Sequence, residues 1–237
     1  FQTMNAWSNG NGLRVFLDGF IFEGANSASE YVGTLEIYGG RGLRNCIIRN
    51  NTYGKNPGGY FDSCELINCV FYGNTSTGTT SAIVHVANGT KLYNTTIVNN
   101  VGNGGAGGGL RMDAGTEAYN VLLWGNKDNR PKGSFHQLYT AENVKLYNCA
   151  IQTGDKVNVE PTKSNVVDLS PSNDASDGPQ FTNPSSGSED FSLRSGSFCI
   201  DKGLDSAIDP LNLTYDIVGN KRKSGAAVDI GAYEFPQ

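Results

Sequence analysis

A short pattern built around an asparagine recurs along this chain. Each copy places an apolar residue two positions before the asparagine and another three positions after it. The asparagines lie at positions 45, 68, 94, 120 and 148, so consecutive copies are 23 to 28 residues apart. A repeat of this length indicates a solenoid, in which each copy forms one coil and stacks on the next. The copies are Leu43–Asn50, Leu66–Asn74, Leu92–Asn100, Ala118–Asn126 and Leu146–Gln152, preceded by a degenerate copy at Phe16–Phe22.

The residue types of the repeat favour strands over helices. The segments are short, rich in β-branched and aromatic residues, and interrupted by asparagine and by many of the 31 glycines. Such runs are typical of strands. A leucine-rich repeat would need a longer ladder of leucines, and helical repeats would need longer apolar patterns at helical spacing. The sequence therefore predicts an all-β fold: a right-handed parallel β-helix of about six coils, with three short strands in each.

Equivalent positions of successive coils should form apolar columns inside the solenoid. The asparagine between two such columns is expected at a sharp turn, because asparagine tolerates left-handed backbone. Its amide could bond the asparagines of neighbouring coils and form a ladder. The expected inward columns are Phe16, Leu43, Leu66, Leu92, Ala118 and Leu146 before the asparagine, Ile21, Ile48, Phe71, Ile97, Leu123 and Ile151 after it, and Ile37, Tyr60, Val86, Met112 and Thr140 in the preceding strand.

The repeat fades near residue 155, which divides the chain into two parts of one domain. Residues 1–154 are expected to form the coils. Residues 155–237 are rich in Ser, Asn, Asp and Pro at first and carry no repeat. The last coil of a solenoid exposes its core and its strand edges, so a covering segment is required there. We expect residues 155–237 to cap the β-helix. The chain begins at Phe1 and offers little for an N-terminal cap, which suggests a processed fragment.

Three segments of the C-terminal part support a family resemblance. They are Leu193–Gly203, Asp216–Arg222 and Asp229–Phe235, of which the last is the most specific. Together with the asparagine-centred coils, they resemble secreted or surface-attached bacterial parallel β-helix repeat proteins of the kind frequent in Bacteroidetes. The resemblance covers nearly the whole chain. It implies a secreted or outer-surface location, with lipid anchoring through a removed N-terminal segment, and it implies no particular activity.

Charge and cysteine content narrow the function classes. The net charge of −5 argues against nucleic acid as a partner, which would require a basic patch. No apolar run is long enough to span a membrane. The five cysteines are odd in number and lack metal-ligand spacing, so neither a disulfide framework nor a zinc site is indicated. Three of them, Cys46, Cys69 and Cys149, follow the repeat asparagine and are expected to be small buried residues.

The outward positions of the first strand of each coil group charged and aromatic residues. They lie nine and seven residues before each asparagine, and neighbouring coils should place them about 4.8 Å apart. Planar rings stack on sugars, and charged groups bond hydroxyl or carboxylate groups, so the surface is suited to an extended polysaccharide. The leading hypothesis is a non-catalytic module that contacts polysaccharide. Its candidate residues are Glu36, Tyr38, Phe61, His85, Arg111, Asp113 and Tyr139.

Two alternatives remain open for this surface. It could be an ordinary solvent-facing column on a structural or adhesin-like spacer. It could also be the site of a polysaccharide lyase, with His85 or Tyr139 as the base and Arg111 neutralising a uronate. Calcium could assist such a lyase, although only Glu36 and Asp113 would offer carboxylates. Their expected separation of roughly three coils is too large for the paired carboxylates of a glycosidase.

The outward face of the third strand is apolar over several coils. A stripe of this length is rarely left in contact with water. We expect the C-terminal segment or the loops to pack across it. If they do not, the stripe predicts a protein partner or self-association through Phe22, Val70, Tyr72, Val98 and Trp124.

Overall fold

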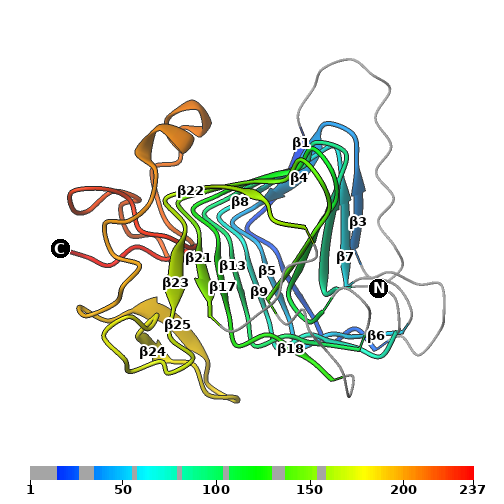
Figure 1. Ribbon diagram of the computed structural model, residues 1–237, viewed down its shortest axis with the longest axis horizontal. Helices are drawn as coiled ribbons and strands as arrows, with labels where there is room; N and C mark the ends of the chain where they lie inside the picture. Colours follow the sequence, from blue (N-terminus) through cyan, green and yellow to red (C-terminus); the bar gives the residue numbers. More distant parts are fainter. Residues whose placement is uncertain are drawn as a thin grey trace.

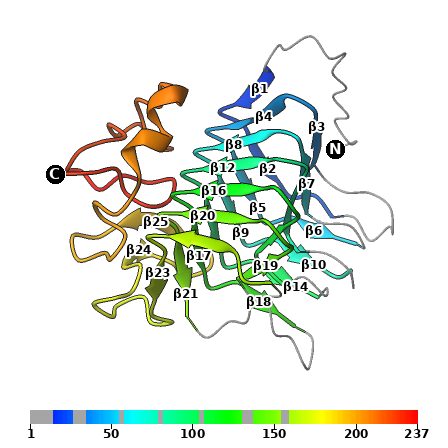
Figure 2. The same ribbon diagram turned by 45° about the horizontal axis from the view of Figure 1, so that its top comes forward.

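The computed structural model shows an all-β solenoid of parallel stacked coils. It describes residues 15–26, 35–54, 58–78, 82–103, 107–129, 137–153 and 159–237. The coils form four sheets, in which every strand pairs in parallel with its equivalents in the adjacent coils. Figure 1 looks along the stacked coils, and Figure 2 shows the strands of successive coils as tiers. Residues 1–13, which offer little for an N-terminal cap, lie outside the described residues, as does His136, for which the sequence favours a structural role.

The first and second sheets carry the strands that precede each repeat asparagine. The first sheet contains β3 (Leu35–Tyr38), β7 (Gly59–Asp62), β11 (Val84–Ala87), β15 (Leu110–Met112) and β19 (Leu138–Thr140). The second sheet contains β1 (Val15–Asp18), β4 (Arg41–Arg44), β8 (Glu65–Ile67), β12 (Lys91–Tyr93), β16 (Glu117–Tyr119), β20 (Lys145–Tyr147) and β22 (Thr162–Ser164).

The third and fourth sheets follow the asparagine. The third sheet contains β2 (Ile21–Glu23), β5 (Ile47–Arg49), β9 (Val70–Tyr72), β13 (Thr96–Val98), β17 (Leu122–Trp124), β21 (Ala150–Gln152) and β23 (Val167–Leu169). The fourth sheet consists of two-residue strands, β6 (Thr52–Tyr53), β10 (Thr75–Ser76), β14 (Val101–Gly102) and β18 (Lys127–Asp128). The sequence predicted three strands in each coil, so the fourth sheet corrects that expectation.

Four turns carry a strand in every sheet, from β3–β6 to β15–β18. Partial turns precede and follow them, and the expected count of about six coils stays a prediction. The parallel pairing continues beyond residue 154, because β22 pairs with β20 and β23 pairs with β21. The described chain then contains an antiparallel hairpin of β24 (Phe181–Asn183) and β25 (Asp190–Leu193), and two short 3-10 helices, η1 (Asp205–Ala207) and η2 (Asp209–Leu211).

The repeat asparagines occupy the turn between the second and third sheets. All five have φ between 44° and 55°, the left-handed conformation expected for them. The predicted amide ladder is present in part: Asn120 Nδ2 donates to Asn94 Oδ1 over 3.2 Å. Asn68 Nδ2 likewise donates to Asn45 Oδ1, and Asn45 Nδ2 donates to Asp18 Oδ1. The other bonds of these amides reach the C-terminal segment. Asn94 Nδ2 donates to the carbonyl of Asp229, and Asn148 Nδ2 donates to that of Lys202.

A second column of asparagines forms the continuous ladder inside the solenoid. Asn51, Asn74, Asn100 and Asn126 are 0–3% exposed and lie where the third sheet turns into the fourth. Each Oδ1 of the last three accepts bonds from both the backbone N–H and the Nδ2 of the preceding asparagine, over 2.9–3.2 Å. The ladder thereby satisfies polar groups that the apolar core could not satisfy.

The neighbouring turn position alternates between asparagine and glycine. Gly125 has φ +67°, and a Cβ built there would lie 2.2 Å from Oδ1 of Asn99 in the previous coil. Gly125→Ala is therefore expected to lower the free energy of unfolding by about 2–3 kcal/mol, through left-handed strain and this clash. Gly115→Ala is the control, because Gly115 has φ +78° and open space around the added carbon. Equal losses for the two variants in urea unfolding would refute the contribution of the clash.

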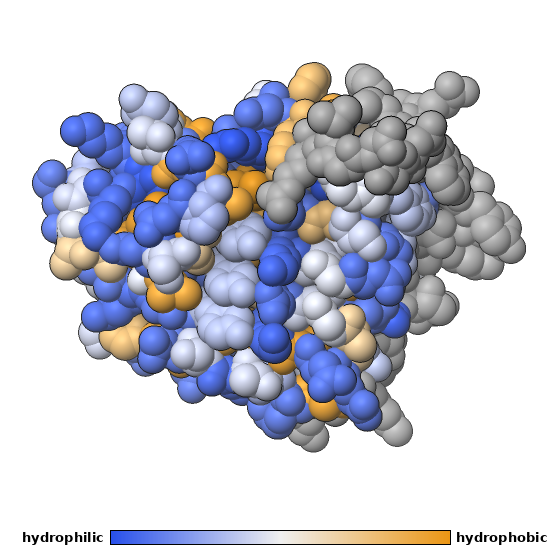
Figure 3. All heavy atoms as spheres, turned by 90° about the horizontal axis from the view of Figure 1, so that it is seen from above, coloured by the Kyte–Doolittle hydropathy of each residue, from blue (hydrophilic) through white to orange (hydrophobic). Residues whose placement is uncertain are grey.

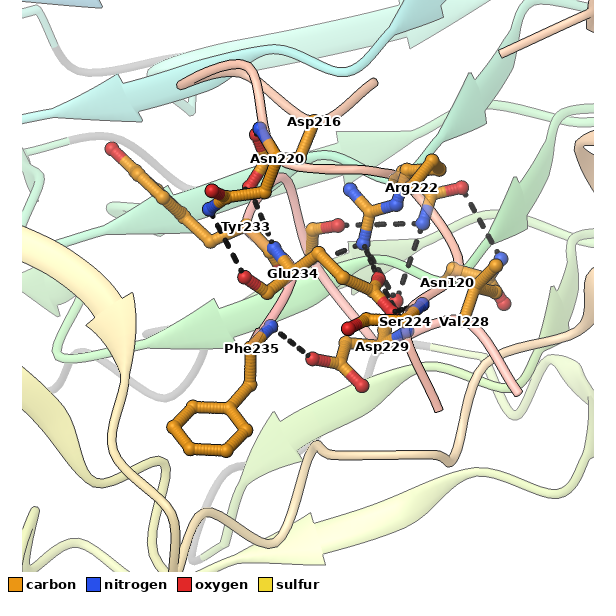
Figure 4. A network of polar contacts seen from close by, with 12 residues as sticks. Asn120, Asp216, Asn220, Arg222, Ser224, Val228, Asp229, Tyr233, Glu234 and Phe235 are labelled. Carbon is orange, nitrogen blue, oxygen red and sulfur yellow. Dashed lines mark hydrogen bonds and ion pairs between the residues drawn. The ribbon is translucent and has the colours of Figure 1, made fainter. Parts of the chain in front are cut away.

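The C-terminal segment packs along the outer face of the third sheet and over the asparagine turn, as Figure 1 shows beside β21 and β23. A buried ion pair joins two parts of this segment: Arg222 Nη2 lies 3.0 Å from Glu234 Oε2, and both side chains are 1% exposed. Figure 4 shows Arg222 also reaching the carbonyl of Asp229, while Asp229 Oδ2 accepts from the N–H of Phe235. Burial raises the pKa of Glu234 to about 7, and the guanidinium opposes this rise.

Candidate functional site

One outward residue from each coil forms a row across the first sheet. The strand register aligns Glu36 with Tyr60, Tyr60 with His85, His85 with Arg111 and Arg111 with Tyr139. Four of the seven candidate residues, Glu36, His85, Arg111 and Tyr139, therefore lie in one row.

The second coil corrects the prediction at one position. Phe61 is fully buried and aligns with the core residues Ile37 and Val86, so it is not a surface residue. Tyr60, expected in the core, takes the outward position. The connection from the first to the second sheet is one residue shorter in this coil, and strand alternation then moves each side chain to the opposite face. Counting back a fixed number of residues from Asn68 therefore selected the wrong ring.

Tyr38 and two rings of the row, Tyr60 and His85, contact one another at an angle. The ring centroids of Tyr38 and Tyr60 are 5.7 Å apart, with 49° between their planes. Tyr60 and His85 are 4.9 Å apart and nearly perpendicular, at 82°. Hydroxyl groups of the tyrosines donate to the acids two residues away, Tyr38 to Glu36 over 3.2 Å and Tyr60 to Asp62 over 3.4 Å. The tilted contacts leave part of each ring face uncovered by its neighbour.

Asp113 joins two side chains of the row, His85 and Arg111. Its Oδ2 lies 2.8 Å from His85 Nε2, and its Oδ1 accepts from Arg111 Nε over 2.9 Å. The guanidinium carbon of Arg111 also lies 5.6 Å from the ring centroid of Tyr139, a cation–π contact. Asp113 comes directly after β15 and aligns its side chain with the row because of strand alternation. At this end of the row, Asp113 thus contacts His85 and Arg111, and Arg111 contacts the ring of Tyr139.

The pKa shifts in the row follow from burial and from these contacts. Burial lowers the pKa of His85 below 6.5, and the bond with Asp113 offsets this only in part. Burial alone would raise the pKa of Asp113, but the bonds from His85 and Arg111 lower it. At neutral pH the imidazole is therefore neutral and donates its Nε2 proton to an ionised carboxylate. Burial and the neighbouring Glu36 raise the pKa of Tyr38 to about 12.

These features limit the chemistry of the row. His85 is only 9% exposed, whereas Tyr38, Tyr60, Arg111 and Tyr139 are half-buried. The row can therefore bind a ligand through ring faces, a guanidinium group and carboxylates. Among the described residues, no group of three His, Cys, Asp or Glu side chains is placed to hold a metal ion.

The second sheet carries a tyrosine stack that the sequence analysis missed. Tyr93, Tyr119 and Tyr147 stack with centroids 5.1 and 4.7 Å apart and planes within 10° of parallel. Beside them, Lys91 and Lys145 both pair with Glu117, over 3.2 and 3.1 Å. Figure 3 looks onto this face, where polar side chains gather in columns. The signal was present in the sequence, because each of these tyrosines directly precedes a repeat asparagine.

The geometry of this stack favours a structural role. Parallel rings cover one another's faces, so the middle ring offers a ligand mainly its edge and its hydroxyl group. The hydroxyl of Tyr119 already donates to Glu117 over 2.8 Å. The tilted rings of the first sheet are therefore the better candidates for stacking on a ligand.

The apolar face of the third sheet is covered. Val70, Tyr72 and Val98 are 0–6% exposed and pack with Phe181, Phe191, Leu193, Cys199, Ile230, Ala232 and Tyr233 of the C-terminal segment. Trp124 is half-buried and donates its Nε1 proton to the carbonyl of Ser170. The first of the two expected explanations for this stripe, packing by the C-terminal segment, is therefore the one observed.

The degenerate first copy is the exception. Phe22 aligns with the core residue Ile48 and packs against the interior, whereas Ile21 is 54% exposed. Leu17, and not Phe16, aligns with Leu43. The expected outward position of Phe22 and the expected inward positions of Ile21 and Phe16 are thus wrong by one residue, because this copy lacks an asparagine from which to count.

Comparisons with family models, with curated proteins and with solved structures find no match for this chain. In the described part of the chain, no helix has the length and apolar character needed to cross a membrane.

Proposed function

We propose that this chain is a secreted or cell-surface module that holds an extended polysaccharide along the outer face of the first sheet without cleaving it. The single observation that carries the proposal is the row of tilted rings from Tyr38 through Tyr60 to His85, continued by Arg111 and Tyr139. The coils repeat about every 4.8 Å, which is comparable with one sugar residue in an extended chain. One protein group could thus meet each sugar.

The location and the finer fold belong to the same proposal. The motifs that resemble surface β-helix repeat proteins support a secreted or cell-surface location. We also propose a right-handed β-helix, because parallel strand crossovers are almost always right-handed. Residues 155–237 would close the solenoid as its C-terminal cap.

Tyr60→Ala tests the binding function. Loss of one stacking ring is expected to weaken polysaccharide binding about tenfold, or 1.4 kcal/mol. Affinity electrophoresis against a panel of plant, animal and bacterial polysaccharides measures it, followed by calorimetry on any polymer that binds. Tyr215→Ala is the matched control, since Tyr215 is 57% exposed on the C-terminal segment. Binding by no polymer of the panel, or equal binding by Tyr60→Ala, would favour a structural spacer.

A polysaccharide lyase is the second candidate, favoured by the contact between His85 and Asp113. An imidazole oriented by a carboxylate through one nitrogen has its other nitrogen available as a base. In that role His85 would remove the proton next to the uronate carboxyl, and Arg111 would neutralise the carboxylate, with Tyr139 beside it. New ultraviolet absorbance from unsaturated products of uronate polymers, with and without calcium, is the measurement. No absorbance on any of these polymers would eliminate the lyase.

A further inference from the structure

A hollow lies at the corner where the first sheet turns into the second. Its volume is about 250 Å³, below the ~300–1,000 Å³ of pockets for drug-sized ligands. It can therefore hold one small group or one sugar ring. Its wall consists largely of three successive turns, with Gly40, Ser63, Asn88 and Gly89 among the lining residues.

The charged residues of the hollow are Arg41, Lys91 and Glu65, so cations outnumber acids. Nη1 of Arg41 is buried and, among the described residues, has no hydrogen-bond partner. A buried donor left without an acceptor costs about 1–3 kcal/mol, and more when it is charged. Arg41 lines the hollow, so a turn of its side chain would bring Nη1 to an acceptor oxygen from outside the chain. Lys91 is 43% exposed at its side chain and can turn toward the same oxygen.

The hollow is connected to the row of rings on the first sheet. Asn88, one of its lining residues, donates its Nδ2 proton to Asp62 Oδ2 over 2.6 Å. The same oxygen accepts the hydroxyl of Tyr60. A sugar stacked on Tyr60 therefore lies beside the hollow, and a substituent of that sugar or of its neighbour can enter it.

We infer that this hollow binds an acidic group of the polysaccharide, a carboxylate or a sulfate, between Arg41 and Lys91. The inference rests on the proposed function and specifies its ligand class: acidic polysaccharides bind more tightly than neutral ones of similar backbone. Glycine at two of the turns leaves room for the oxyanion, since a Cβ on Gly89 would meet no atom within 4 Å. Arg41 supplies the charged hydrogen bond and Lys91 a second positive charge.

The test uses inorganic sulfate, glucuronate and glucose as small probes. At constant ionic strength, sulfate and glucuronate are expected to raise the melting temperature above that in chloride, and glucose is not. Arg41→Gln should abolish this rise, and Lys91→Gln should weaken binding severalfold. Lys145→Gln is a matched control, because Lys145 pairs with the same Glu117 and is similarly exposed, at 46%, but lies outside the hollow.

The outcomes separate the inference from the proposed function. No rise with sulfate or glucuronate overturns the inference, as does an equal effect of Lys91→Gln and Lys145→Gln. If polysaccharides bind through Tyr60 but acidic and neutral polymers bind equally, the inference fails and the proposed function stands. If the small anions bind through Arg41 but no polysaccharide binds, the proposed function fails, and the hollow is an anion site of another kind.

Discussion

Arg222→Met is expected to disrupt the fold of the C-terminal segment, and with it the packing of this segment on the solenoid, and to lower the free energy of unfolding by about 3–5 kcal/mol. Arg222 is 1% exposed and pairs with Glu234. The same Nη2 donates to the carbonyls of Asp229 and Tyr233 over 3.2 and 3.3 Å. Without the guanidinium, the carboxylates of Glu234 and Asp229 stay buried and lose the cation that Arg222 supplies. A buried charge that has lost its partner is among the most destabilising changes known for a folded protein.

The released segment should be detected separately from global unfolding. It covers Val70, Tyr72 and Val98, which would become exposed and bind an apolar dye. Hydrogen exchange should speed up in residues 199–235 before it does in the first sheet, and proteolysis should cut there first. Chemical and thermal unfolding then measure the total loss in the free energy of unfolding.

A neighbouring lysine provides the control for Arg222. Lys223 pairs with Asp205, but its side chain is 48% exposed. Exposed ion pairs contribute little to stability, so Lys223→Met should unfold at nearly the wild-type temperature. The double variant Arg222→Met/Glu234→Met should recover part of the loss, because it removes one of the orphaned charges. If Arg222→Met unfolds as Lys223→Met does, the buried ion pair is not what keeps the C-terminal segment folded.

The solenoid could be predicted because its repeat states the same information several times. Leu43, Leu66 and Leu92 form one buried column, as expected, and each copy supports the alignment of the others. A feature that occurs in only one coil is harder to predict, because no other copy supports its alignment. The connection between β7 and β8 contains two residues, Ser63 and Cys64, where that between β11 and β12 contains three. That single missing residue exchanged the faces of two neighbouring rings in the candidate site.

Residue type could not tell which column of asparagines would form the continuous ladder. The repeat contains asparagine at two turns, and both columns suit left-handed backbone and amide ladders equally well. The outcome depends on the C-terminal segment, whose main chain binds Asn94, Asn120 and Asn148. Those contacts join residues 54 to 135 positions apart. These contacts cannot be predicted from the sequence, because the C-terminal segment has no repeat that could be aligned with the coils. The hollow at Arg41 was missed for the same reason, since it exists only once three turns are stacked.

Asn100→Ala is expected to be the most damaging substitution within the coils, with a loss of about 3–4 kcal/mol. The side chain is fully buried at the centre of the ladder. Its Oδ1 accepts from the N–H and the Nδ2 of Asn74, and its Nδ2 donates to the carbonyl of Phe71 and to Asn126 Oδ1, over 2.9–3.1 Å. Removing it leaves a buried N–H and a buried carbonyl without these partners, in neighbouring coils.

Urea unfolding measures the effect, and a fall in melting temperature of roughly 10 °C should accompany it. Asn129→Ala is the control on an exposed asparagine of the next coil and should change little. Asn100→Asp separates the ladder from simple packing. It keeps the shape but loses both Nδ2 bonds and buries a charge, so it should be at least as damaging as alanine. A near-wild-type Asn100→Asp would mean that water or a shifted neighbour satisfies the ladder. The amide ladder would then result from the stacking of the coils and would not fix their register.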